Sequence, residues 1–213
     1  MTETGSGCNR RDLMRGAALF ALVVGVPATI ASLSDIDERE RPTERQRMFA
    51  REVSQLVIPR TTTPGAGEIG VGDFLILALA HGLGGTDEPI ERDALAGHAQ
   101  SFRRLDGTLR FLPWLERELD RRAGGDWLRA TPAIRAVHLA ELDRETFPPG
   151  PPPKSPSPWQ MIKGLIVTGY YTSETGAARE LRYELVPGRF DPDLPLEPGA
   201  RAWSSDWIAV EFG

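Results

Sequence analysis

Apolar residues recur at helical spacing along much of the chain, separated by stretches rich in proline and glycine. The first such segment opens with Thr43 and Gln46, which have the spacing of a capping box. Phe49 lies one turn further on, and Pro59 ends the pattern because proline removes a helical hydrogen bond. The sequence therefore predicts a helix between these two boundaries.

Five later segments carry the same period, and several of them show start signals. Asp73 has the position of an N-cap for the apolar run that follows it. Thr131 and Ser157 each precede a proline at the first helical position. Helices are accordingly expected at residues 73–83, 90–102, 108–122, 131–146 and 157–171.

The connecting segments lack a regular pattern. Residues 60–72 are rich in Thr, Gly and Pro, and residues 147–158 contain seven prolines, which favours an extended polyproline II arm. Such an arm serves either as a stiff spacer or as a contact for a partner. Beyond residue 171 we expect only a short strand at 183–186. The predicted fold class is mainly α, with about six helices, long Pro/Gly-rich connections and an extended C-terminal tail.

The first 31 residues have the order of an export signal. Arg10 and Arg11 stand just before the sixteen uncharged residues from Gly16 to Ala31. A basic segment before a short apolar run is typical of a secretory signal, and the consecutive arginines resemble the twin-arginine (Tat) type. We expect cleavage after Ala31. An uncleaved anchor is the alternative, although the run is shorter than the roughly twenty residues that span a bilayer.

The remaining sequence predicts a charged linker at residues 32–42 and one helical domain at residues 43–213. Hydrophobic residues make up 40% and charged residues 26% of the chain, which is ordinary globular composition. The net charge is −5 and no basic stripe is present, which argues against nucleic-acid binding. The one cysteine, Cys8, lies in the signal, so a mature chain would hold neither a disulfide nor a Cys-ligated metal or haem.

No catalytic or cofactor motif accompanies these elements. The histidines form no metal-binding pair, so structural roles are expected for His81, His98 and His138. Acidic residues lie among arginines on the helix at 108–122, which indicates a solvated face for Glu116, Glu118 and Asp120. Glycines before the second helix could cradle an anion, but no phosphate-binding fingerprint accompanies Gly65, Gly67, Gly70 and Gly72.

Several large aromatic residues lie in the last third of the chain, where few regular elements are expected. They need a surface against which to be buried, either the chain's own helices or a partner. The candidate partner interface consists of Trp159, Tyr170, Tyr171, Phe190, Trp203 and Trp207.

Three segments carry a family resemblance. The first runs from Phe49 to Phe74 and includes LVIPRTTTPGA at residues 56–66; the others are GYYTSETG at 169–176 and VPG at 186–188. Together with the Tat-type signal, they resemble the gluconate 2-dehydrogenase subunit 3 family. Residues 85–155 carry no motif of that family.

The resemblance implies a cofactor-free small subunit that partners a large flavoprotein of the glucose–methanol–choline type. In such complexes the large subunit holds FAD and the catalytic histidine, and electrons pass to a multihaem cytochrome c subunit or to another acceptor. The large subunit often lacks a signal, and the small subunit's signal carries both through the Tat translocase. The resemblance thus implies a periplasmic sugar or polyol dehydrogenase complex at the inner membrane, with no catalytic, cofactor-binding or metal-binding residue in this chain.

Two other functions stay open on the sequence alone. The first is a stand-alone exported enzyme or binding protein that uses the Gly-rich loop and His81. The second is a membrane-tethered structural protein held by residues 16–31.

Overall fold

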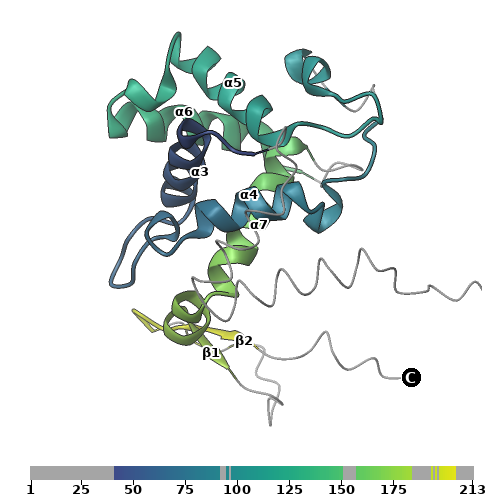
Figure 1. Cartoon of the computed structure of the whole chain (residues 1–213). Coiled ribbons are helices and arrows are strands. Elements are labelled where there is room, and N and C mark those ends of the chain that lie inside the picture. The colour runs from purple at the N-terminus through teal and green to yellow at the C-terminus, as the bar shows by residue number, and fades with distance from the viewer. Residues whose placement is uncertain are drawn as a thin grey trace, which may run out of the picture.

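The computed structural model describes residues 41–91, 95, 97–150, 157–183, 193, 195 and 197–204 (Figure 1). The predicted signal, most of the linker and the centre of the proline arm lie outside these residues. So do the predicted strand residues 184–186 and two of the candidate interface residues, Phe190 and Trp207. Among the helices that the structure describes, none is long and apolar enough to cross a membrane.

The described chain is mainly helical, which confirms the predicted fold class. Short 3₁₀ helices at Ala66–Glu68, Leu83–Gly85, Gly97–Phe102 and Trp127–Arg129 fill several connections. The α-helices are α3 (Glu44–Val57), α4 (Val71–Ala80), α5 (Phe111–Ala123), α6 (Pro132–Thr146) and α7 (Pro158–Tyr171).

Local capping signals explain where three of these helices begin. The Thr43 side chain accepts a hydrogen bond from the backbone N–H of Gln46, and the Gln46 side chain accepts one from Thr43, so the predicted capping box is formed. Ser157 and Gln160 form the same arrangement before α7. The Thr131 side chain caps α6 ahead of its first-turn proline.

The predicted N-cap at Asp73 is wrong. The helix α4 begins two residues earlier, and its N-cap is Gly70, which has a φ of 85°. Glycine adopts this left-handed conformation without steric cost, so the turn can close before the apolar run starts. Asp73 lies in the first helical turn instead, where its backbone N–H already bonds the carbonyl of Gly70.

The helix expected at residues 90–102 is also largely wrong. The structure has only the 3₁₀ helix Gly97–Phe102 in the described part of this segment. Ile90 instead donates its backbone N–H to the carbonyl of Gly107, and Arg103 pairs with Leu109 in an isolated antiparallel bridge. These backbone bonds close an irregular loop against the start of α5.

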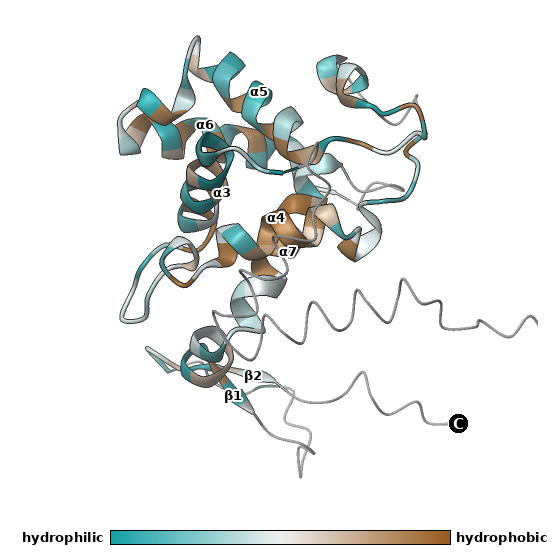
Figure 2. Ribbon diagram, viewed as in Figure 1, coloured by the Kyte–Doolittle hydropathy of each residue, from teal (hydrophilic) through white to brown (hydrophobic). Residues whose placement is uncertain are grey.

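The core is centred on α4, which packs against α3 and α7 (Figures 1 and 2). Figure 2 shows α4 and the adjoining part of α7 as the most hydrophobic ribbon. The largest fully buried side chains include Trp127, Trp159 and Tyr170, and the Phe49 and Trp127 rings meet edge to face at 5.4 Å. Most of the favourable free energy of folding comes from burying such apolar surface.

A single small residue allows α4 and α7 to come close together. Gly169 lies on α7, and a side chain at this position would overlap the ring of Phe74 on α4. The aromatic ring therefore lies directly against the backbone of α7. This contact fixes the position of the last turn of α7 relative to α4.

Acidic residues on α5 form ion pairs with several neighbouring elements. Glu118 is 5% exposed and pairs with Arg121 and Arg122. Arg45 on α3 pairs with Glu116 at 2.5 Å. The prediction that these carboxylates form a solvated face is therefore wrong for Glu118, which lies inside a network between α5 and its neighbours.

The pKa of Glu118 follows from two opposed effects. Burial disfavours the charged carboxylate and acts to raise its pKa, whereas hydrogen bonds from Arg121 and Arg122 favour the charged form. The hydrogen bonds prevail, and the pKa of Glu118 lies below its usual value of 4.5.

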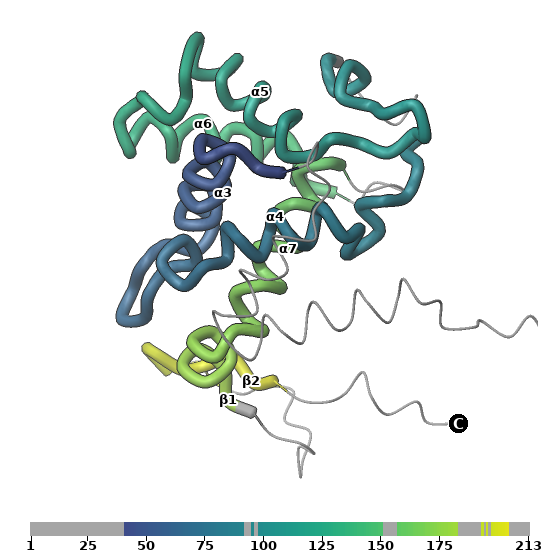
Figure 3. Tube along the Cα trace, in the orientation of Figure 1, coloured from purple at the N-terminus to yellow at the C-terminus, as the bar shows by residue number. Residues whose placement is uncertain are grey.

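Two short strands form a parallel pair at the end of the molecule opposite α5 (Figures 1 and 3). β1 (Leu181–Tyr183) pairs with β2 (Ala202–Ser204), with Leu181 opposite Ala202. The predicted strand at 183–186 thus begins two residues earlier. Figure 3 shows the loop between α3 and α4 at the same end of the molecule.

The contact between α4 and α7 can be tested by a matched pair of substitutions. Gly169→Ala should lower the free energy of unfolding by about 1–3 kcal/mol, because the added methyl group displaces Phe74. Gly164→Ala on the same helix meets no atom within 4 Å and should stabilise the chain by up to about 1 kcal/mol through helix propensity. Urea unfolding measures both; equal effects would contradict the close contact.

The ion-pair network predicts a pH dependence of stability. Because the pKa of Glu118 is lowered in the folded state, its stabilising contribution is present above about pH 4.5 and is lost as the pH falls through the folded-state pKa. Glu118→Gln should therefore destabilise the chain by about 2 kcal/mol at pH 7 and by progressively less as the pH falls below the folded-state pKa. Exposed Glu174→Gln is the control, and its effect on the free energy of unfolding should not change across this pH range.

Candidate functional site

The loop before α4 meets the end of α7 through a small polar cluster. The Tyr170 hydroxyl donates to the carbonyl of Pro64 at 3.1 Å and lies 3.4 Å from the hydroxyl oxygen of Thr63. The Thr63 hydroxyl in turn donates to the carboxylate of Glu180. These partners are 106 to 117 residues apart in sequence, so the cluster ties the two ends of the domain together.

A tight turn after α7 places Glu180 beside Thr63. The Ser173 hydroxyl donates to the carbonyl of Tyr170 at 2.6 Å and accepts the backbone N–H of Gly176 at 3.0 Å. One π-helical turn, Gly176–Glu180, follows and leads into β1. The sequence GYYTSETG therefore specifies a helix end and a chain reversal.

The loop at residues 60–70 is also held by its own contacts. The backbone N–H of Ala66 donates to the carbonyl of Ile58 at 2.9 Å. Glu68 pairs with Arg60 at 2.6 Å and accepts the backbone N–H of Gly65. The hydrogen bond from Arg60 is the main reason that the pKa of Glu68 lies below its usual value. The loop therefore presents Thr62 and Thr63 from a defined backbone.

Two glycines of this segment are held in close contact with α3. A side chain at Gly67 or Gly72 would overlap the backbone of α3 at Arg51, and both glycines are buried. A side chain would therefore not fit at either position. The structure explains these glycines by close packing between the loop, the start of α4 and α3.

A groove of about 660 Å³ opens beside the Thr63–Tyr170–Glu180 cluster. Its walls come from the Thr-rich loop, from the π-helical turn with the start of β1, and from the segment that leads into β2. The lining residues are Thr62, Thr63, Tyr171, Arg179, Glu180, Leu181, Gly199, Ala200, Arg201 and Ala202.

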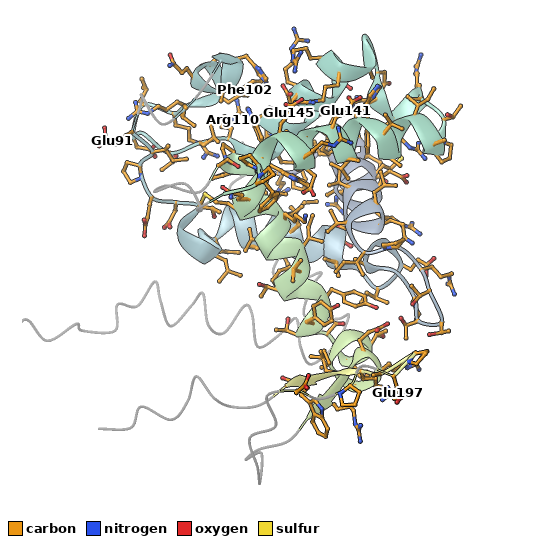
Figure 4. All side chains as sticks on the ribbon, turned by 180° about the vertical axis from the view of Figure 1, so that it is seen from behind. Glu91, Phe102, Arg110, Glu141, Glu145 and Glu197 are labelled. Atoms are coloured by element: carbon orange, nitrogen blue, oxygen red, sulfur yellow. The ribbon has the colours of Figure 1, made fainter. Side chains whose placement is uncertain are left out.

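Several arginine and aromatic side chains are exposed in this region. Arg179 and Arg201 line the groove, and neither guanidinium forms an ion pair with another described residue. Arg182 lies over the ring of Trp203, with 4.4 Å between the guanidinium carbon and the ring centroid. Trp203 is 51% exposed. Figure 4 shows side chains projecting from this end of the molecule, where Glu197 is labelled.

The predicted interface aromatics divide into two groups. Trp159 and Tyr170 are each 1% exposed and are instead core residues. The Trp159 indole N–H donates to Asp143 at 2.8 Å, which satisfies its polar edge inside the chain. Tyr171 and Trp203 are exposed beside the groove and stay candidates for partner contact.

The histidines are dispersed over the fold. His81 caps the C-terminal end of α4, whereas the Gly-rich loop lies before its N-terminal end, about 15 Å away along a ten-residue helix. His98 lies in a 3₁₀ helix near Glu118, and His138 lies on α6. In the chain as described, no three His, Cys, Asp or Glu side chains are grouped in a way that could hold a metal ion.

The sequence reasoning missed the groove arginines and the roles of Thr63 and Glu180. Arg179 and Arg182 are three residues apart, and this spacing was the available sign of a basic surface around the start of β1. Arg201 joins them only through the parallel pairing of β1 with β2, which no local pattern predicted.

The polar cluster predicts a coupling between residues far apart in sequence. Tyr170→Phe and Thr63→Val should each lower the free energy of unfolding by about 1 kcal/mol, because each leaves a partly buried partner without its hydrogen bond. The double variant should lose less than the sum of both, by at least about 0.5 kcal/mol. Tyr171→Phe, at the exposed neighbouring tyrosine, is the control and should have the free energy of unfolding of the wild type. If the effects of Tyr170→Phe and Thr63→Val were strictly additive, the two residues would not be coupled.

One of three comparisons with known proteins finds a match, and it agrees with this arrangement of motifs. No curated protein and no solved structure matches the chain significantly. The family model for gluconate 2-dehydrogenase subunit 3 matches residues 44–188, which is more than half of the chain and includes both segments that form the polar cluster. The chain therefore belongs to the gluconate 2-dehydrogenase subunit 3 family, whose members are small subunits of dehydrogenase complexes and associate with a catalytic dehydrogenase subunit.

Proposed function

We propose that this chain is the non-catalytic small subunit of a periplasmic FAD-dependent sugar dehydrogenase, and that it assists the assembly, stability and Tat export of the catalytic subunit. The family match over residues 44–188 carries the proposal. The export role rests on Arg10 and Arg11, which precede the uncharged run up to Ala31. Because the Tat pathway carries folded proteins, one signal can serve two chains that have already assembled.

On this proposal the redox chemistry belongs to the partners. FAD and the reacting histidine lie in the large subunit, which is of the glucose–methanol–choline type, and a multihaem cytochrome c subunit accepts the electrons. The packing of Gly67 and Gly72 on α3 supports this division, because close packing accounts for these glycines without a bound phosphate. The complex is held at the inner membrane through its subunits.

A second function, a stand-alone enzyme that uses the Gly-rich loop together with His81, has little support. The loop and His81 lie at opposite ends of α4. A substrate would have to extend along the whole helix to reach both.

Purification of the full-length protein from its native host tests the assembly role. We expect a stable 1:1 complex with a yellow flavoprotein, visible as co-eluting flavin absorbance, with haem absorbance when the cytochrome subunit is retained. The complex should oxidise a sugar or polyol, and the isolated small subunit should not. A monodisperse small subunit that is active without a flavoprotein would overturn the proposal.

Substitution of the paired arginines tests the export role. Arg10→Lys together with Arg11→Lys should retain both subunits in the cytoplasm, because the translocase requires the arginine pair. Arg15→Lys, in the same basic segment but outside the pair, is the control and should leave export unchanged. Immunoblots of periplasmic and cytoplasmic fractions give the readout. Normal export of the flavoprotein in the double variant would exclude the escort role.

The N-terminus of the exported protein separates this proposal from a membrane-tethered structural role. A mature chain that starts near Ser32 and fractionates with the flavoprotein agrees with the escort role. An intact N-terminus in the membrane fraction, without a flavoprotein, would support the tether.

A further inference from the structure

The β1–β2 pair is an incomplete sheet within the described part of the chain. It contains two strands of three residues each, and no other described strand pairs with either of them. Parallel sheets are normally covered on both faces, and a two-stranded sheet alone is marginally stable. Here Arg182, Ala202 and Trp203 are exposed. Among the described residues, therefore, neither outer edge of the pair has a partner strand, and side chains of the pair are exposed.

The groove beside this sheet carries excess positive charge. Arg179 and Arg201 approach it from different segments, and Arg182 lies on the adjoining strand. The one carboxylate that lines the groove, Glu180, accepts the hydroxyl of Thr63. Since the whole chain has a net charge of −5, this local excess opposes the overall charge.

The exposed side chains here are also of the types that dominate binding energies at protein interfaces. Trp, Tyr and Arg are over-represented among interface residues whose truncation is costly. Trp203 and Tyr171 provide large apolar surfaces, and Arg182 holds the Trp203 ring from one side by a cation–π contact. Holding the ring in place reduces the entropy lost when a partner packs on it.

We propose that this groove binds an extended, acidic segment of the catalytic dehydrogenase subunit, which pairs with the sheet as an additional strand; this rests on the proposed function. Backbone pairing with an open strand edge supplies affinity, and side-chain contacts supply selectivity. Carboxylates of the segment pair with Arg179 and Arg201, and an apolar side chain packs on Trp203.

Charge complementarity favours an acidic segment of another protein over a second copy of this chain. Two copies each carry a net negative charge, so their approach is electrostatically unfavourable. Arg179 and Arg201 attract an acidic segment of a partner, whatever the position of the rest of that partner. Dimerisation through the same sheet is the outcome that an oligomeric-state measurement would reveal.

Charge reversal in the purified two-subunit complex tests this proposal. Arg179→Glu with Arg201→Glu should weaken the affinity about 100-fold, roughly tenfold for each reversal, because like charges then face each other. Arg179→Gln with Arg201→Gln should have a smaller effect, and both variants should reduce the salt dependence of dissociation. Trp203→Ala should weaken binding about tenfold.

Arg110→Glu provides the matched control. Arg110 is exposed and lies at the opposite end of the molecule from Glu197 (Figure 4), so its reversal should change the affinity less than twofold. The arginine variants should unfold at the wild-type temperature, since Arg110, Arg179 and Arg201 are exposed. Amide hydrogen exchange in residues 199–204 should slow when the wild-type subunits associate.

The possible results separate this inference from the proposed function. If the wild-type chain has no flavoprotein partner, the proposed function fails and the inference fails with it. If the complex forms but the groove variants bind like the wild type, or if Arg110→Glu weakens binding equally, the inference alone is wrong. A wild-type homodimer that is lost in the groove variants would also overturn it in favour of a second copy.

Discussion

The contact between the ring of Phe74 and the backbone of α7 at Gly169 determines where the C-terminal part of the described chain can lie. It brings the last turn of α7 against the start of α4 and therefore places Tyr170 over the Thr-rich loop. The π-helical turn and β1 follow within ten residues, too few for an independent path. The groove and its arginines thus depend on one close approach between two helices.

The parts of this fold that local chemistry specifies were predictable from the sequence. Thr43, Thr131 and Ser157 each satisfy backbone N–H groups at a helix start, and this needs only a few neighbouring residues. The N-cap predicted at Asp73 was wrong because Gly70 starts the same helix in another way, through a left-handed backbone conformation rather than a side-chain hydrogen bond. The helix predicted at residues 90–102 was largely wrong because backbone hydrogen bonds to the segment around Gly107 and Leu109 outweigh a weak helical period.

Burial of charge and assembly of the groove were not predictable in this way. Glu118 has the sequence context of a surface residue. Its arginine partners lie three and four residues further along the same helix, but only tertiary packing buries its side chain. Trp159 and Tyr170 resembled interface aromatics because their large size alone does not say which surface buries them. The groove combines residues 62–63, 179–182 and 199–202, whose proximity depends on contacts more than a hundred residues apart.

The composition of the groove from distant segments has a consequence for the order of events in the cell. Contacts with long sequence separation form late, because the entropic cost of closing the loop must be met first. A nascent or misfolded chain would display the arginines and aromatics but not their common geometry. A partner that binds this surface would therefore select chains that have completed folding, and the surface would act as a checkpoint for folding before assembly.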